Sequence, residues 1–229
     1  MIGIIVPAHD EEAHIEACVR SLLLAGVHPL LLGEPVVITV VADACRDRTA
    51  ALARFHGVYA IDVELKNVGL ARQLGAAAAV TAGARWLSFT DADSVVAPDW
   101  LVAQLSLGAD AVCGTVAVSE WGGYGERMRR HFESTYTDAD GHAHIHGANL
   151  GVSAQAYEKA GGFSGLETGE DVALVAALRS TGAHIAWSSA PRVVTSARAN
   201  FRAPRGFGAT LERIETRREW VGAVVGAAA

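Results

Sequence analysis

The chain has 229 residues, of which 51% are hydrophobic and 19% are charged, and its formal net charge is -6. This length and apolar content predict a folded domain with a core of its own and exclude a disordered chain. The acidic balance disfavours nucleic acid as a partner, and no run approaches the roughly 20 apolar residues of a membrane-spanning helix. Three widely spaced cysteines, Cys18, Cys45 and Cys113, are typical of reduced thiols in a cytoplasmic protein.

The first half of the chain alternates between short apolar runs and segments with helical spacing. Strands are expected at 3–7, 36–41, 59–63, 86–90 and 111–116. Between them, helices are expected from an Asp10 cap to Gly26, through 49–53, over 70–82 and over 98–105. Short connections between alternating strands and helices predict a parallel, doubly wound sheet with helices on both faces.

Acidic residues stand where successive predicted strands end. Asp10 and Glu11 follow the first strand, Asp43 the second, and Asp91 and Asp93 the fourth. Each of them alone could be a helix cap or a turn residue. Together they favour a cleft at the carboxyl edge of the sheet, where open α/β sheets bind ligands, and paired carboxylates suit Mg²⁺ or Mn²⁺. The G-x-G-x-x-G fingerprint is absent after the first strand, which disfavours a dinucleotide-binding domain.

The second half is less periodic. A short helix is expected near 124–134, a strand at 149–153, and helices at 154–160 and 172–179. Strands at 183–187 and 193–198 and a helix at 211–221 follow. His142, His144 and His146 alternate, so they could face one way and bind a metal, or they could lie in a solvated loop or meet hydroxyls or phosphates of a ligand.

Several segments resemble the motifs of family 2 glycosyltransferases, in the same order over about residues 2–200. Residues 4–12 resemble Val-Pro-x-x-Asn-Glu, 40–49 resemble Val-x-Asp-x-Ser-x-Asp-x-Thr, and 67–73 resemble the Asn-x-Gly segment. Asp91-Ala92-Asp93 is similar to the D-x-D motif, and 147–149, 161–163 and 170–171 are similar to the acceptor-side segments. The resemblance implies the GT-A fold, a Rossmann-like, mainly parallel sheet flanked by helices on both faces. It implies one domain over 1–229, with a nucleotide-sugar-binding half at 1–116 and an acceptor-side half at 117–229.

The resemblance also implies roles on the donor side. Asp93 would ligate Mn²⁺ or Mg²⁺ directly, and Asp91 would hold the ribose or reach the metal through water. Asp43 would accept hydrogen bonds from the nucleobase. The other implied nucleotide-binding residues are Pro7, Ala8, Glu11, Lys66, Gly69, Arg72 and Ala92, with Gly69 allowing a close approach of the backbone to the nucleotide.

On the acceptor side, the resemblance implies Asp171 as the general base, with Glu170 as the alternative. An ordinary acidic first turn of a helix would explain the same pair without catalysis. His146, Gly147 and Asn149 are the implied contacts of the transferred sugar or the acceptor.

The sequence departs from the family in having no histidine at the expected distance after Asp171. His184 falls inside a predicted strand. Arg198, Arg202 and Arg205 are candidates for a cationic diphosphate clamp in its place, and a solvated basic loop is the equal alternative.

These observations predict a cytoplasmic, metal-dependent enzyme. It would move a hexose from a UDP- or GDP-linked donor to a hydroxyl of a small or lipid-linked acceptor, with inversion. Peripheral membrane contact is compatible with this function, and nucleic acid is not expected as a partner. A nucleotidyltransferase is the alternative, but the acidic 10–12 segment is unlike a triphosphate-binding loop. A non-catalytic nucleotide-sugar-binding protein is disfavoured because Asp91, Asp93 and Asp171 are all present.

Overall fold

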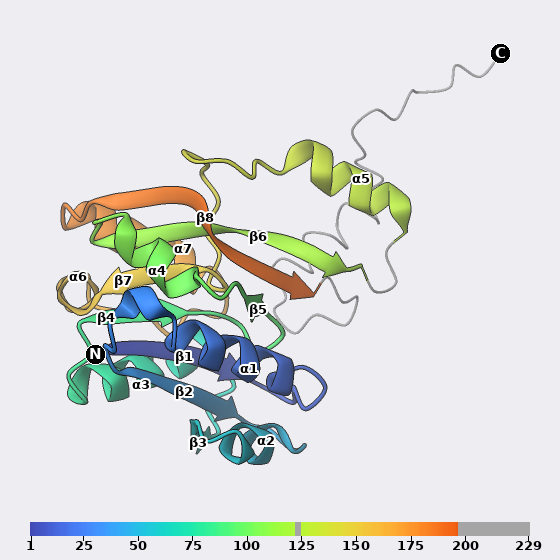
Figure 1. The fold of residues 1–229 in the computed structure, drawn as a ribbon, viewed down its shortest axis with the longest axis vertical. Coiled ribbons are helices and arrows are strands. Elements are labelled where there is room, and N and C mark those ends of the chain that lie inside the picture. The colour runs from blue at the N-terminus through green and yellow to red at the C-terminus, as the bar shows by residue number, and fades with distance from the viewer. Residues whose placement is uncertain (122–124, 197–229) are drawn as a thin grey trace. The chain divides into compact units, whose positions relative to one another are not determined.

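The computed structural model describes residues 1–121 and 125–196 (Figure 1). By its internal contacts the chain forms two compact units. Unit 1 comprises Met1–Ala117 and Asp138–Thr195, and unit 2 comprises Val118–Thr137 and Ser196–Ala229. The segment 138–195 therefore folds with the first 117 residues. The expected helix at 211–221 lies outside the described residues.

The described strands form one sheet in the order β3-β2-β1-β4-β7-β6-β8-β5. Strands β1 to β4 pair in parallel as predicted, and they are β1 (Ile2–Ala8), β2 (Val36–Asp43), β3 (Tyr59–Val63) and β4 (Trp86–Phe89). The remaining strands are β5 (Val95–Val96), β6 (Ala111–Glu120), β7 (Leu150–Ser153) and β8 (Ile185–Ser196). Because β7 runs antiparallel to both β4 and β6, the sheet is mixed.

The position of β7 decides which residues meet at the carboxyl edge of the sheet. Phe89, at the end of β4, pairs with Leu150, at the start of β7. The residues just before β7 therefore reach the edge where the chain leaves β4 toward Asp91. An antiparallel strand at this place brings the 146–149 segment beside the D-x-D motif.

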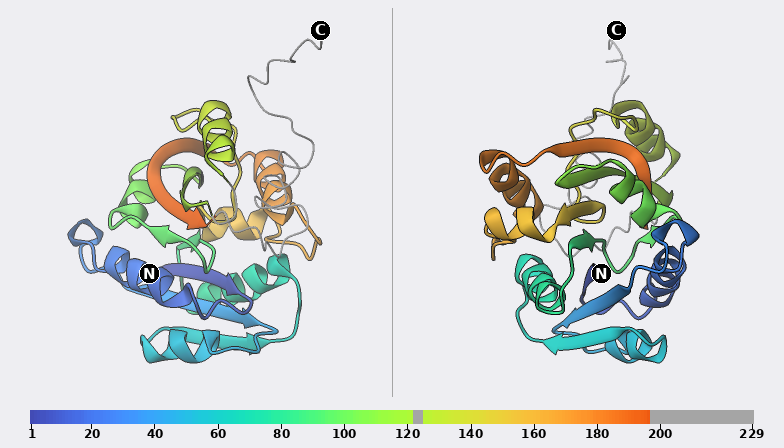
Figure 2. Two further views of the ribbon diagram at one scale, coloured as in Figure 1. Left: turned by 90° about the vertical axis from the view of Figure 1, so that its right-hand side faces the viewer. Right: turned by 60° about the vertical axis from the view of Figure 1, so that its left-hand side comes forward.

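Helices cover both faces of the sheet. On one side α1 (Ile15–Gly26) contacts α2 (Thr49–Phe55) and α4 (Trp100–Ser106). On the other, α3 (Val68–Thr81) packs on β1 and β2, and α6 (Ala154–Lys159) contacts α7 (Glu170–Ser180). Figure 2 shows α1 and α3 on opposite sides of the parallel strands. A 3₁₀ turn, η1 (Pro29–Leu31), follows α1.

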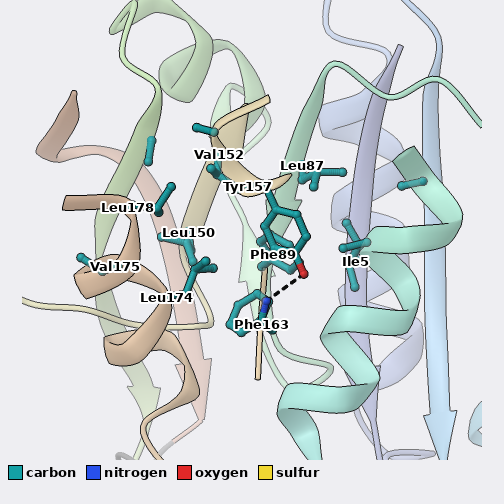
Figure 3. Packing of buried hydrophobic residues seen from close by; sticks show 14 of the residues in the cluster. Ile5, Leu87, Phe89, Leu150, Val152, Tyr157, Phe163, Leu174, Val175 and Leu178 are labelled. Carbon is teal, nitrogen blue, oxygen red and sulfur yellow. Dashed lines mark hydrogen bonds between the residues drawn. The ribbon is translucent and has the colours of Figure 1, made fainter. Parts of the chain in front are cut away.

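A cluster of buried hydrophobic residues joins α3, α6 and α7 to the sheet (Figure 3). Phe89 lies fully buried within it, edge-on to Phe163 with ring centroids 4.9 Å apart. The Tyr157 hydroxyl accepts a 3.0 Å hydrogen bond from the backbone N–H of Phe163. Burying a phenylalanine of this kind contributes about 2–3 kcal/mol. The cluster therefore fixes the loop before α7 against the end of β4.

Two local expectations were wrong, and one strand was not expected. Helix α1 begins at Ile15, so Asp10 does not cap it; Asp10 instead lies in the loop with φ of 50°. The two strands expected at 183–187 and 193–198 are one strand, β8, which continues through Pro191. The two-residue strand β5 was not expected, because so short a segment has no detectable periodicity.

Within the described part of unit 2, helix α5 spans Glu126–Thr135. Phe132 stacks on Tyr136 with ring centroids 4.6 Å apart and also contacts Trp121 edge-on at 5.5 Å. These aromatic contacts support the helix expected near 124–134. Over the described ranges of both units, no helix is long and apolar enough to cross a bilayer.

Candidate active site

The loops that follow β1 and β2 are tied together by hydrogen bonds. The Asp10 carboxylate accepts one from the backbone N–H of Arg46 at 2.6 Å, and the Glu11 N–H donates one to Thr49 Oγ1 at 2.7 Å. Aspartate is one of the few residues besides glycine that readily adopts the positive φ found at Asp10. The two loops thus form one hydrogen-bonded surface at the carboxyl edge of the sheet.

Asp43 organises the loop that leads from β3 to α3. Its Oδ1 accepts the N–H groups of Leu65 and Lys66, both at 2.7 Å, and its Oδ2 accepts that of Asn67 at 2.8 Å. The Asn67 side chain then caps α3 by accepting the Leu70 N–H at 2.9 Å. Because the carboxylate is only 6% exposed, its principal contacts are with this loop. The exposed side chain of Lys66 projects from the same loop at a positive φ of 53°.

Asp91 and Asp93 leave β4 on either side of the buried Ala92, and both are partly exposed. Beneath them, the Cys18 sulfur of α1 lies 3.5 Å from the carbonyl oxygen of Asp91. Burial raises the pKa of the Cys18 thiol, and the carboxylates of Asp93, Asp91 and Glu11 raise it further. Carboxylates from the β1 and β4 exits therefore both act on the Cys18 thiol beneath them.

Strand β8 ends beside the D-x-D turn. The Ser94 N–H donates to the Asp91 carbonyl at 3.1 Å, and the buried Ser94 hydroxyl donates to Thr195 Oγ1 at 3.0 Å. The diphosphate-clamp candidates come shortly after this point in the chain. Arg198, Arg202 and Arg205 all lie outside the described residues.

Arg72 bridges the D-x-D motif and the start of α7. Its Nη2 donates to Asp91 Oδ1 at 2.6 Å, and its Nη1 donates to Glu170 Oε1. Both Arg72 and Glu170 are buried. Burial alone would lower the pKa of Arg72, but the carboxylates of Asp91, Glu170 and Asp171 raise it. The guanidinium therefore stays charged among three carboxylates.

Asp171 has a different environment from Glu170. Gly169 precedes α7 with φ of 75°, so Glu170 and Asp171 occupy the first helical turn. Asp171 is partly exposed, and its Oδ2 accepts the backbone N–H of Gly147 at 2.9 Å. A partly exposed carboxylate held in one orientation suits proton transfer better than the buried, ion-paired Glu170.

The three histidines form a column of stacked rings. His142 and His144 lie 5.5 Å apart between centroids, and His144 and His146 lie 5.9 Å apart, both nearly parallel. Trp187 contacts His142 edge-on at 5.8 Å. Burial lowers the pKa of His146 to about 4; His144 and His142 also lower it, whereas Asp91 raises it. In the described part of the chain these rings do not form a group of converging metal ligands, so the geometry gives no support to a three-histidine metal site.

Two residues expected to contact ligands are engaged with the protein instead. The Asn149 side chain is fully buried, accepts the Trp100 indole N–H at 2.9 Å, and donates to the Thr115 and Pro191 carbonyls at 2.7 Å each. A Cβ on Gly69 would collide with the carbonyl oxygen of Ser164. These contacts give Asn149 and Gly69 packing roles: the close approach at Gly69 is to the chain itself.

Asp91 and Asp93 are partly exposed carboxylates that would hold a divalent cation, with Arg72 donating to Asp91 Oδ1. Mg²⁺ and Mn²⁺ usually complete such a shell with substrate phosphates and water. Within residues 1–121 and 125–196, three potential ligand atoms converge only at Asp10, Cys45 and Asp47, which are part of the hydrogen-bonded loop surface.

The role of Arg72 as a bridge was not predictable from the sequence. Its partners lie 19 and 98 positions away, and no local pattern links them. The only signal was an arginine on the buried face of an alanine-rich helix, where a charged side chain needs a partner. Pro7 and Ala8 were expected to line the base and ribose pocket; both side chains are buried at the end of β1.

Comparison with known proteins agrees with this geometry. The profile of "Glycosyl transferase family 2" matches residues 3–161, more than half of the chain. Curated protein sequences give no match. Among solved structures, residues 1–349 of TarS from S. aureus, in complex with UDP-GlcNAc, align with a TM-score of 0.68 and 14% identity over 90% of this chain and 61% of that one.

GalNAc-T7 with UDP, GalNAc and Mn²⁺ aligns with a TM-score of 0.63 and 13% identity, over 86% of this chain and 44% of that one. The chain thus spans less than two thirds of the length of either protein. At these identities the likeness concerns the fold, which is the mixed α/β fold of GT-A glycosyltransferases. Since the family profile covers most of the chain, the chain belongs to glycosyl transferase family 2.

Proposed function

We propose that this protein transfers a hexose from a UDP- or GDP-linked sugar to an acceptor hydroxyl, with inversion and with the help of Mn²⁺ or Mg²⁺. The observation that carries the proposal is that Asp91 contacts Arg72 and Asp171 contacts Gly147, which packs against the same guanidinium, while Asp93 follows Asp91 by two residues. Family membership supports nucleotide-sugar glycosyl transfer as the reaction class. Structural neighbours solved with UDP, UDP-GlcNAc and Mn²⁺ support the donor and metal.

The donor occupies the loop surface after β1, β2 and β4. Pro7, Ala8, Glu11 and Ala92 border the base and ribose. Asp43 shapes the 65–67 loop through three hydrogen bonds from backbone N–H groups. The remaining lone pairs of its carboxylate accept hydrogen bonds from the nucleobase. Lys66 is exposed on this loop, where an ammonium can meet a phosphate or a base oxygen.

The D-x-D carboxylates hold the metal. Asp93 binds it directly, and Asp91 binds the ribose or reaches the metal through water. When bound, the cation neutralises the charge that develops on the departing diphosphate. If Arg198, Arg202 and Arg205 contact the same diphosphate, the metal contributes less.

Asp171 is the general base. It accepts the proton of the acceptor hydroxyl while that oxygen attacks the anomeric carbon. The bond from that carbon to the diphosphate breaks at the opposite face, and the nucleoside diphosphate leaves with the bonding electrons. Direct displacement of this kind inverts the anomeric configuration. Glu170 is the weaker candidate because Arg72 holds it in a buried ion pair.

The acceptor lies beside the 146–147 segment, next to Asp171. His146 and Gly147 border it, and Asn149 supports the segment from below. A small or lipid-linked acceptor suits this arrangement. Three free cysteines, two of them buried, support a reducing compartment such as the cytoplasm as the place of action.

The test combines nucleotide binding with product identification. UDP and GDP are titrated by calorimetry with and without Mn²⁺ into the wild type and Asp93→Ala, and UDP-glucose, UDP-GlcNAc and GDP-mannose are then supplied as donors. We expect one nucleotide to bind in the micromolar range, to require the metal and to fail with Asp93→Ala. Release of nucleoside diphosphate supports a glycosyltransferase, whereas release of pyrophosphate from a nucleoside triphosphate and a sugar phosphate would support a nucleotidyltransferase. If no nucleotide binds, the proposal fails; metal-independent binding would instead favour the arginine clamp.

A further inference from the structure

The buried guanidinium of Arg72 connects two carboxylates that belong to opposite sides of the reaction. Asp91 comes from the donor side, at the end of β4, and Glu170 from the acceptor side, at the start of α7. The two η nitrogens of Arg72 each bind one of them, so the planar fork sets their separation. Arg72 is only 3% exposed, which leaves little of it for a bound nucleotide.

Protein groups also cover the faces of this guanidinium. The Phe163 ring centroid lies 5.6 Å from Arg72 Cζ. Gly147 packs so closely that an added Cβ would lie 2.6 Å from Cζ, closer than real Cβ atoms approach other atoms. The φ of Gly147 is not in the left-handed region, so this contact explains the glycine better than the backbone conformation does.

The same glycine holds the proposed base. Its N–H donates to Asp171 Oδ2 at 2.9 Å while its α-carbon rests against Arg72. A continuous set of contacts thus runs from Asp91 through Arg72 and Gly147 to Asp171. If Arg72 moved, the support of Gly147 and the separation of Asp91 from Glu170 would change together.

We propose that Arg72 is a positioning residue that couples the donor-side carboxylate Asp91 to the acceptor-side base Asp171 without contacting the nucleotide. This role of Arg72 in catalysis rests on the proposed function. Loss of the fork would leave the nucleotide-side loop that Asp43 holds unchanged, but it would free Asp91 Oδ1 and release the Gly147 peptide that orients Asp171. Turnover would therefore fall by much more than nucleotide affinity.

The first test separates turnover from nucleotide affinity. Arg72→Gln and Arg72→Lys are compared with Arg85→Gln. This control breaks an exposed ion pair with Glu34 just before β4, at the opposite end of the strand from Asp91. Binding of UDP and GDP with Mn²⁺ is measured by calorimetry, and turnover is measured as nucleoside diphosphate released from UDP-glucose, UDP-GlcNAc or GDP-mannose with water as acceptor. For Arg72→Gln we expect kcat to fall by about tenfold or more and the nucleotide Kd to stay within about threefold.

Arg72→Lys keeps the charge but cannot bind two carboxylates as a fork, so we expect it to lose turnover as well. Wild-type turnover in Arg72→Lys would overturn the proposal, because charge alone would then suffice. A raised Kd with unchanged kcat in Arg72→Gln would also overturn it and would make Arg72 a nucleotide contact. If Arg72→Gln does not fold, Glu170→Gln removes one arm of the bridge and takes its place, with the same expectations.

A double-mutant cycle tests the contact with Gly147. Gly147→Ala places a Cβ against the pinned guanidinium and should lower kcat in the wild-type background. In the Arg72→Gln background, the side chain at position 72 is shorter and is not held at both ends. Gly147→Ala should therefore lower kcat in that background by less than about threefold. Equal effects in both backgrounds would overturn the proposed coupling.

Amide hydrogen exchange tests the positioning role of Arg72 without any sugar donor. The Gly147 N–H should exchange at least about tenfold faster in Arg72→Gln than in the wild type, because its hydrogen bond to Asp171 is released. Arg85→Gln should leave the exchange unchanged. If the wild type turns over no donor, the proposed function fails while this measurement still tests Arg72. Unchanged exchange in Arg72→Gln would overturn the inference even if the enzyme proved active.

Discussion

The backbone N–H of Gly147 donates a 2.9 Å hydrogen bond to Oδ2 of Asp171, a residue 24 positions later in the chain. Strand β7 and the aromatic contacts of Phe163 hold the two segments in place. The bond orients a carboxylate that is partly exposed, whereas its neighbour Glu170 is buried in an ion pair. Two adjacent acidic residues thus have different surroundings, and we propose Asp171, the more exposed of the two, as the general base.

Asp171→Asn should therefore abolish proton transfer while keeping the shape of the site. The amide oxygen can still accept the Gly147 N–H, and the exposed Val172 N–H, which donates to Oδ1 at 2.8 Å in the wild type, can bond to water instead; the amide cannot act as a base. We expect kcat for donor turnover to fall by about 100-fold or more, with nucleotide Kd unchanged. Steady-state release of nucleoside diphosphate and calorimetry measure the two quantities.

Asp99→Asn is the matched control, because Asp99 forms an exposed ion pair with Arg192. Its turnover should equal that of the wild type. If Glu170→Gln lost turnover by as much and Asp171→Asn remained active, the assignment of the base would be reversed.

Asp43→Asn should lower the stability of the protein as well as its affinity for the nucleotide. The carboxylate accepts three backbone N–H groups, and an amide would turn its own N–H₂ toward at least one of them. An unmet buried donor costs about 1–3 kcal/mol, so the free energy of unfolding should fall by that amount. Urea denaturation measures it, and Asp62→Asn, at an exposed position on β3, serves as the control. Unchanged stability in Asp43→Asn would show that the carboxylate does not organise the 65–67 loop.

The alternating pattern of residues 1–116 was sufficient to predict the parallel strands. The strands are short, mostly apolar runs, and each connecting helix has a stop signal such as Gly26, so local chemistry determines both. The antiparallel insertion of β7 was not predictable in the same way. Its pairing of Leu150 with Phe89 is a contact between distant segments, and the register of such pairs depends on tertiary packing.

The residues of the candidate site show the same difference between local sequence patterns and contacts of distant segments. Asp91 and Asp93 were proposed from a short motif whose spacing has a chemical reason, and Asp171 was proposed from the resemblance to family 2 glycosyltransferases. Asn149 also lies in a motif, yet its hydrogen bonds reach Trp100 and Pro191, which no local pattern connects. Motifs therefore identified which residues gather at the edge of the sheet, but the structure was needed to separate those that face a ligand from those that hold the others in place.

Asn149→Asp is expected to destabilise the fold with little effect on the chemistry. The substitution removes two donors and points a carboxylate at the carbonyls of Thr115 and Pro191 inside the protein. The loss in the free energy of unfolding should be about 3 kcal/mol or more. Gln73→Glu makes the same amide-to-carboxylate change at an exposed position of α3 and should be neutral. If Asn149→Asp were as stable as the wild type but lost acceptor affinity, Asn149 would be a ligand contact after all.

His146 should make the stability of the protein depend on pH in a defined window. Burial, with the neighbouring imidazoles of His144 and His142, lowers its pKa from the ordinary 6.5 to about 4. Between these values the unfolded chain binds a proton that the folded chain does not, so the contribution of His146 is complete above pH 6.5 and is lost as the pH falls toward 4. The slope that one such group adds is at most about 1.4 kcal/mol per pH unit.

The free energy of unfolding, measured with urea from pH 4 to 7, should therefore fall less steeply in His146→Gln than in the wild type. His184→Gln, at an exposed position, should follow the wild-type curve. Parallel curves for His146→Gln and the wild type would show that His146 keeps an ordinary pKa and that the histidine column accommodates its charge.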